Sequence, residues 1–316
     1  MKRAACALLL CLALPAQAYV RSRNNNGQGP CIWWPTHGHS FQIDAQGSPD
    51  APLDATYDAI RKSFQTWAAV SCSDLRFSEE PLSTSASNRL VGFESGGTNH
   101  NLVLFRTLNC AQVVPANDPC KAQGGCGNAY DCWEHGDGII ATTTTTSKSS
   151  TGEILDSDIE MNDAPPSSGN KLTFTTVDGL PCTRSGETGC VRIDVQNTIT
   201  HEAGHSLGLD HTLDPGATMY ASAPSGQTSK RVLGADDIAG ICAIYPRGAA
   251  SVTCTSGQGG GNGGGCSAAQ TDPGAALAAL AVLLQIRRRS RRRPQLPMSS
   301  STNPATAARC QSGIEN

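Results

Sequence analysis

The pattern of hydrophobic and polar positions predicts a mixed α and β domain. Four large apolar residues recur at spacings of three and four: Tyr57, Ile60, Phe64 and Trp67. This spacing places them on one face of a helix. Pro52 stands near the start of that helix, where its fixed φ angle suits the first turn. We expect the apolar face to pack on a sheet.

Short runs rich in apolar and β-branched residues predict the strands of this sheet. They cover residues 31–34, 40–43, 89–93, 101–105, 139–146 and 153–162. The first two runs flank a turn that carries His37 and His39. Isolated loop histidines are usually solvated, so we do not assign these two as metal ligands.

Two further helices are predicted in the second half of the chain. Asp194 is a suitable N-cap for a helix over 195–207 whose core-facing residues are Val195, Ile199 and Ala203. A closing helix is marked by Ile238, Ile241 and Tyr245, and Pro246 stops it. The regions 107–135 and 165–190 show no periodicity and are predicted to be loops, the first an insertion pinned by disulfides.

Both ends of the chain differ in composition from its middle. Residues 1–18 join Lys2 and Arg3 to an apolar run and the small-residue sequence Ala16-Gln17-Ala18, which is typical of a secretory signal. We therefore expect a folded domain over 19–248 in an oxidising compartment. A glycine-rich linker follows at 249–270, then an apolar run with an arginine cluster at 271–293 and a tail at 294–316.

Cysteine usage agrees with export. Of the 14 cysteines, ten lie between Cys31 and Cys254, an even set that predicts disulfides. Spacing suggests only one pair, Cys182 with Cys190. The alternative, a structural zinc site at Cys120, Cys126 and Cys132, has spacings of six where such sites use two to four.

Charge narrows the classes of partner. Residues 19–266 hold 15 basic and 25 acidic side chains, a net charge of −10. Nucleic-acid binding needs basic patches, so we exclude that class. An acidic exported domain suits calcium binding or plain solubility.

The strongest chemical signal is the stretch from His201 to His211, which reads H-E-x-x-H-x-x-G-x-x-H. On a helix, His201 and His205 lie on one face, one turn apart. Gly208 can adopt the positive φ that ends a helix and lets His211 return as a third ligand. Three ligands leave a fourth tetrahedral position for water, which is typical of catalytic zinc.

Glu202 lies beside the first ligand and is the predicted general base. It would take a proton from the zinc-activated water and later pass it to the leaving amine. The predicted reaction is hydrolysis of internal peptide bonds. Two rival hypotheses are a surface binding protein without catalysis and a metallohydrolase that acts on something other than peptides. Glu202 argues against the first, since a binding module does not need that carboxylate.

This motif resembles that of the metzincin metallopeptidases. These enzymes carry a methionine turn beneath the metal, and Met219 lies eight residues after His211, where such a turn is expected. Thr212 and the stretch through Met219 and Tyr220 resemble the matrixin group. The resemblance implies an α+β metzincin domain with a mostly parallel twisted sheet, long helices and a small C-terminal subdomain, active as a monomer on protein or peptide substrates.

The resemblance also suggests functions for two of the predicted strands. The strand at 139–146 would form the sheet edge to which a peptide substrate adds as an antiparallel strand, although a polar surface strand explains it equally well. Asp156, Asp158 and Glu160 share one side of the next strand. They are possible calcium ligands, as in matrixins, or the solvated face of a half-buried strand.

The C-terminal region resembles a second pattern. Cys266, the apolar run and the arginines together are similar to the C-terminal sorting tags of myxobacterial surface proteins, although 23 residues follow the arginines here. This resemblance implies a cell-envelope attachment, on the outer surface of a Gram-negative cell. Only twelve residues separate the expected cleavage site from Cys31, and they contain no cysteine-switch motif. We therefore expect no cysteine switch.

Overall fold

The structure is a computed structural model that describes residues 19–85, 89–254 and 307–315. The strands are β1 (Val20–Arg21), β2 (Gly38–Ile43), β3 (Arg76–Glu79), β4 (Leu102–Arg106), β5 (Ile139–Lys148), β6 (Ile154–Asn162), β7 (Phe174–Thr175), β8 (Ile193–Asp194), β9 (Leu209–Asp210) and β10 (Ala307–Glu315). The helices are α1 (Leu53–Ala68), α2 (Cys110–Val113), α3 (Cys120–Gln123), α4 (Cys126–Tyr130), α5 (Val195–Ser206) and α6 (Ala235–Ile244), with a 3₁₀ turn at Ser229–Arg231.

The expected signal at 1–18 and the greater part of the linker, sorting segment and tail, 255–306, lie outside the described residues. No helix in the described ranges is long and apolar enough to cross a membrane.

A six-stranded sheet in the order β10-β5-β6-β4-β2-β3 forms the centre of the fold. The pairs β6–β4, β4–β2 and β2–β3 are parallel, whereas β5 runs antiparallel to β6 and β10 antiparallel to β5. This arrangement confirms the predicted α+β class with a mostly parallel sheet. Two short pairs, β1–β9 and β7–β8, lie apart from it.

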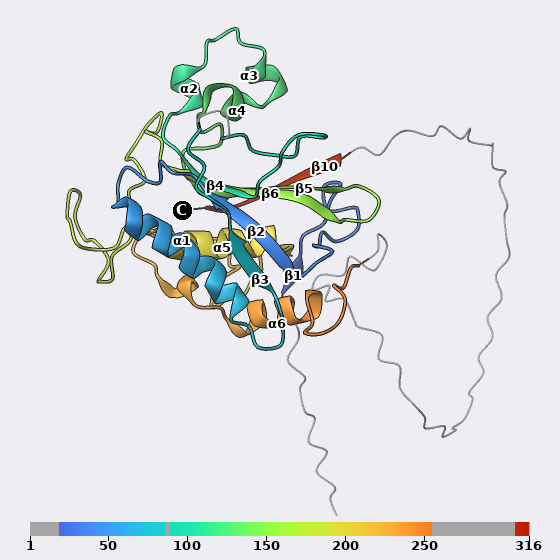
Figure 1. Cartoon of the computed structure of the whole chain (residues 1–316). Helices are drawn as coiled ribbons and strands as arrows, with labels where there is room; N and C mark the ends of the chain where they lie inside the picture. Colours follow the sequence, from blue (N-terminus) through green and yellow to red (C-terminus); the bar gives the residue numbers. More distant parts are fainter. Residues whose placement is uncertain (1–18, 86–88, 255–306, 316) are drawn as a thin grey trace, which may run out of the picture.

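Helices α1 and α5 pack together under one face of the sheet, and α2, α3 and α4 rise above the other (Figure 1). The predicted apolar stripe of α1 is buried, and Phe64 stacks on Phe41 of β2 with ring centroids 4.1 Å apart. The Trp67 indole N–H donates to the carbonyl of Thr200 on α5 at 2.8 Å. The core therefore fixes α5 between α1 and the sheet.

Three local predictions were wrong. Residues 31–34 form only isolated bridges, and residues 107–135 contain the short helices α2, α3 and α4. Residues 89–93 form no strand, because side chains satisfy their backbone groups. The N–H of Val91 binds the Asn128 side chain, and the N–H of Gly92 binds the Asp158 carboxylate at 2.6 Å.

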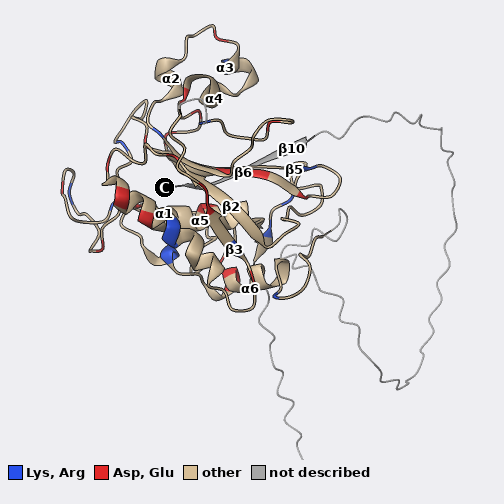
Figure 2. Ribbon diagram, viewed as in Figure 1, with Lys and Arg blue, Asp and Glu red and all other residues tan. Residues whose placement is uncertain are grey.

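The acidic side chains of β6 are buried, which corrects the interpretation that they form a solvated face. Figure 2 marks the acidic positions of the ribbon in red. Asp158 accepts from the backbone N–H groups of Gly92 and Leu102. Glu160 accepts from the Arg106 guanidinium at 2.7 Å, with both side chains nearly inaccessible to solvent. Contacts with Gly92, Leu102 and Arg106 therefore hold this face in the interior.

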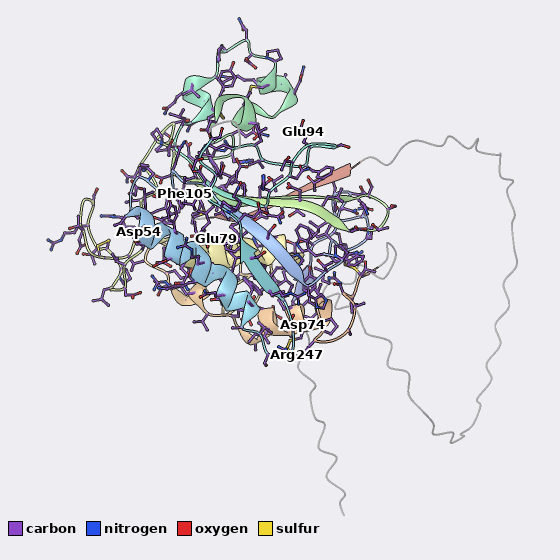
Figure 3. The ribbon with its side chains drawn as sticks, viewed as in Figure 1. Asp54, Asp74, Glu79, Glu94, Phe105 and Arg247 are labelled. Carbon is purple, nitrogen blue, oxygen red and sulfur yellow. A yellow bond between two sulfur atoms is a disulfide. The ribbon has the colours of Figure 1, made fainter. Side chains whose placement is uncertain are left out.

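All ten cysteines from Cys31 to Cys254 form disulfides, as predicted. The pairs are Cys31–Cys254, Cys72–Cys242, Cys110–Cys132, Cys120–Cys126 and Cys182–Cys190. The first joins the start of the domain to residues beyond 248. The second is reinforced nearby, where Arg247 donates to the Ser71 carbonyl and the N–H of Gly248 to Asp74; Figure 3 labels Asp74 and Arg247 at this end of the fold.

Candidate active site

Helix α5 positions two of the three predicted metal ligands. Asp194 caps its N-terminus by accepting from the N–H of Asn197 at 2.7 Å, as the sequence predicted. Val195, Ile199 and Ala203 are fully buried in the core. This anchoring turns His201 and His205, one turn apart, to the side of α5 where His211 approaches.

Gly208 brings in the third ligand. It adopts φ +89°, and a Cβ atom there would lie 2.5 Å from the carbonyl oxygen of Ile32. Only glycine fits this turn, because both the backbone conformation and the space exclude a side chain. The chain reverses after Gly208, and β9 then leads directly to His211.

The three Nε2 atoms of the histidines converge. They lie 3.1 Å apart for His201–His205, 3.1 Å for His205–His211 and 3.2 Å for His201–His211. His201 Nδ1 faces the Thr218 carbonyl at 2.6 Å and His205 Nδ1 faces the Leu209 carbonyl at 2.9 Å. A carbonyl only accepts, so in both rings Nδ1 carries the hydrogen and Nε2 presents a lone pair.

Lone pairs this close repel one another unless a cation lies among them. Ligands about 2.0–2.1 Å from a tetrahedral zinc ion lie roughly 3.3 Å from one another, close to the spacing found here. Burial is the main cause that lowers the pKa of His205 to about 3 and the pKa of His201 well below its usual range. Neutral imidazole is the form that binds metal, so the three residues fit zinc. Among the described residues, the other group this compact contains the disulfide-bonded Cys182 and Cys190.

Glu202, the predicted general base, is fully buried beside the histidines. Its carboxylate Oε2 accepts from the hydroxyl of Thr143 on β5 at 2.7 Å, and the same hydroxyl lies 3.0 Å from the Glu202 carbonyl oxygen. Thr143 thus ties the carboxylate to the sheet. Sequence reasoning missed it, since it is one of five consecutive threonines with no distinguishing local signal.

Met219, the residue predicted to form a methionine turn, packs against Gly204 of α5. A Cβ atom on Gly204 would lie 2.3 Å from the Met219 sulfur, so the glycine in the middle of the motif permits this close approach. Asp237 of α6 fixes the turn by accepting from the N–H groups of Thr218 and Met219 at 2.6 and 3.0 Å. Sequence reasoning had not assigned this role to Asp237.

A third residue that sequence reasoning did not assign to the site, Lys230, lies next to His201. Its ammonium donates to the carbonyl of Tyr220, and it lies 3.4 Å from His201 Nδ1. That last contact joins two donors, so it is not a hydrogen bond. Burial lowers the pKa of Lys230 to about 8, opposed by the charges of Glu202 and Asp237.

The proposed calcium ligands do not meet at one point. In the described part of the chain, Asp156, Asp158 and Glu160 form no group of ligand atoms within 4.8 Å of one another. Burial, followed by the charge of Asp156, raises the pKa of Asp158 well above its usual value. Glu160 is already paired with Arg106. Calcium remains a prediction.

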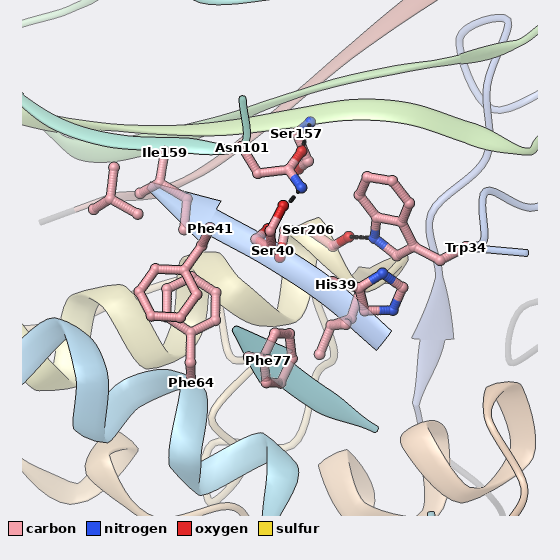
Figure 4. Close-up of a pocket in the computed structure, with 12 residues that line it drawn as sticks. Trp34, His39, Ser40, Phe41, Phe64, Phe77, Asn101, Ser157, Ile159 and Ser206 are labelled. Atoms are coloured by element: carbon pink, nitrogen blue, oxygen red, sulfur yellow. Dashed lines mark hydrogen bonds between the residues drawn. The ribbon is translucent and has the colours of Figure 1, made fainter. Parts of the chain in front are cut away.

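A small cavity of about 20 Å³ lies in the core next to the site (Figure 4). Its lining includes His39, Phe41, Phe64 and Phe77, and the Trp34 indole N–H closes one side by donating to the Ser206 carbonyl at 2.8 Å. It holds about one water molecule. His39 Nε2 is buried without a hydrogen-bond partner in the protein. The cavity is therefore part of the core and too small for a substrate side chain.

The fold and the site together have the features of the metzincin class: a mostly parallel sheet, three converging histidines with a glutamate in the same motif, and a methionine packed against that motif. A model of the matrixin family matches residues 33–246, which is more than half of the chain. The chain therefore belongs to the matrixin family, whose members are zinc-dependent metalloendopeptidases and are generally secreted.

Individual relatives match over short stretches. Human neutrophil collagenase is 58% identical over 45 residues, which is 14% of this chain and 10% of that protein. Human matrilysin is 48% identical over 46 residues, 15% of this chain and 17% of that protein. Metalloendoproteinase 1-MMP of Arabidopsis thaliana is 42% identical over 55 residues, 17% of this chain and 15% of that protein. The matches thus span less than a fifth of each relative.

Proposed function

We propose that this protein is an exported zinc-dependent endopeptidase that hydrolyses internal peptide bonds, with Glu202 as general base. The observation that carries the proposal is the convergence of three Nε2 lone pairs, 3.1–3.2 Å apart, beside a buried carboxylate. Such an arrangement is costly for a protein that binds no metal, because it buries mutually repelling groups.

Each residue has a distinct role in this reaction. His201, His205 and His211 hold the zinc ion, which supplies Lewis acidity toward a water molecule and the scissile carbonyl when bound. Glu202 accepts a proton from the attacking water and donates it to the leaving amine. Thr143 keeps the Glu202 carboxylate in place during this transfer. Met219 packs against α5 at Gly204, which lies between His201 and His205 in the sequence.

The sequence resemblances also suggest where the enzyme is located and how it is attached. We propose that residues 1–18 direct export, that residues 271–293 with Cys266 attach the protein to the cell envelope, and that it acts as a monomer on extracellular proteins. Calcium at Asp156, Asp158 and Glu160 is part of the same hypothesis. The N-terminal sequence and total mass of the exported protein, and its calcium content, test these assignments.

Zinc content and proteolysis of casein test the central proposal. We expect one zinc per chain and cleavage by the native protein, and loss of cleavage with retained zinc in Glu202→Gln. Glu94→Gln is the matched control, because Glu94 is exposed and lies in the loop before β4 (labelled in Figure 3). Tight zinc binding without cleavage of any peptide bond would favour the rival hypothesis of a binding protein.

A further inference from the structure

Strand β10 lies on the outer edge of β5. Its residues pair antiparallel with β5 from Ala307 opposite Lys148 to Ile314 opposite Ala141, with a register shift before Glu315. Since β6 lies on the other side of β5, the sheet would end at β5 if β10 were removed. Figure 1 shows the red β10 strand alongside β5.

This pairing places the C-terminal segment over the catalytic glutamate. Ser312 is the register partner of Thr143, the residue whose side chain binds Glu202. Strand β10 also contacts α5, the helix that carries Glu202 and two of the histidines. The backbone of β10 therefore crosses the site above its general base.

One strand edge can pair with only one partner. An extended peptide that binds beside α5 must use the outward N–H and C=O groups of β5. Strand β10 takes these groups along the whole of β5. A substrate that binds as an added strand and the protein's own C-terminal segment are therefore mutually exclusive.

We infer that Ala307–Glu315 is an intramolecular inhibitor that occupies the substrate position of this enzyme, and that a cut between residues 255 and 306 activates it. The inference rests on the proposed peptidase function. The inhibitory segment then lies on the C-terminal side of the domain. Processing near Cys266 would both allow attachment to the cell envelope and release the inhibitory strand.

The tether sets the size of the effect. Because the segment is joined covalently to the domain, its effective concentration is on the order of 1 mM, so a strand that binds with a dissociation constant of about 10–100 μM keeps roughly 10 to 100 closed chains per open chain. We therefore expect cutting, followed by removal of the released segment, to raise kcat/KM by that factor, with most of the change in KM.

The experiment uses the full chain with a site-specific protease site inserted in the glycine tract at 259–265. Peptidase activity is measured before and after cutting and removal of the C-terminal fragment. Gln311→Pro/Ser312→Pro is compared in the uncut chain, because adjacent strand residues alternate in direction and one of the two lost N–H groups faces β5. We expect this variant to be active without cutting. Ser300→Pro/Ser301→Pro, outside β10, is the matched control and stays latent.

Binding gives a readout independent of catalysis. A labelled peptide of residues 307–315 should bind the cut chain, and its proline-containing counterpart should not. Equal activity before and after cutting overturns the inference and leaves the proposed function intact. A cut chain that carries zinc and binds the labelled peptide but cleaves nothing refutes the peptidase function and supports the strand site. Cleavage within 307–315 in the uncut chain, seen by mass spectrometry, would make the segment a substrate and overturn its inhibitory role.

Discussion

Replacing Thr143 by valine tests whether the sheet orients the general base. The two side chains have nearly the same shape, so the substitution removes only the hydroxyl that donates to Glu202 Oε2 at 2.7 Å. A hydrogen bond to a charged group contributes about 1.5–3 kcal/mol. If that energy is expressed in the transition state, where the carboxylate must face the attacking water, kcat falls roughly tenfold to a hundredfold.

The assay is steady-state cleavage of a fluorogenic peptide, with all variants compared in the same processed form. KM and zinc content should stay near the native values, because both hydrogen bonds of the Thr143 hydroxyl go to Glu202 and neither goes to a metal ligand. Thr143→Ser restores the donor and should recover most of kcat.

Thr145→Val is the matched control. Thr145 is also buried on β5, two residues along and on the same side of the strand, but its hydroxyl pairs with that of Ser157 at 2.9 Å. An unchanged kcat in Thr143→Val would refute the reasoning. So would an equal loss in Thr145→Val, which would indicate a general defect of the strand.

Three further predictions concern His39, the turn at Gly208 and the bound metal. His39 has its pKa lowered to about 4, by burial first and then by His37 and Arg76; the unfolded chain binds its proton near 6.5, so stability should rise between these two pH values. At 1.36 kcal/mol per unit this corresponds to at most about 3 kcal/mol, and His39→Phe should flatten the pH profile of denaturant unfolding by that amount; an unaltered slope would contradict it. Gly208→Ala should cost about 2 kcal/mol or more and weaken zinc binding, whereas Gly138→Ala, with open space around it, should be nearly neutral in thermal melts. Chelation should destroy activity and lower the free energy of unfolding, by about 4 kcal/mol relative to zinc at a thousand times its dissociation constant; an identical melting temperature with and without metal would argue against a bound ion.

One network of charged side chains, most of them buried, holds the insertion after β4. Arg89, with 2% of its side chain exposed, binds the carboxylates of Asp44 and Asp131, and Arg106 joins Asp131 to Glu160. Removing one partner of such a cluster leaves an uncompensated buried charge, which is strongly destabilising. These contacts fix the loops over β6 and explain why its acidic side lies in the interior.

The sequence determined the chemistry of the site because that chemistry is local. The spacing of His201 and His205 on one helix, the glycine turn at Gly208 and the N-cap at Asp194 depend on backbone geometry within about two or three turns. The apolar stripe of α1 and the short disulfide Cys182–Cys190 are local in the same sense. Each could be read without knowledge of the rest of the chain.

Only the tertiary structure decided the contacts between distant segments. Thr143 meets Glu202 across 59 positions, and Cys31 pairs with Cys254 across 223. The burial of Asp158 and the position of β10 on β5 likewise depend on which strands pair and which loops cover them. Local periodicity carries no information about these pairings, because they are selected by the packing of the whole sheet and its helices.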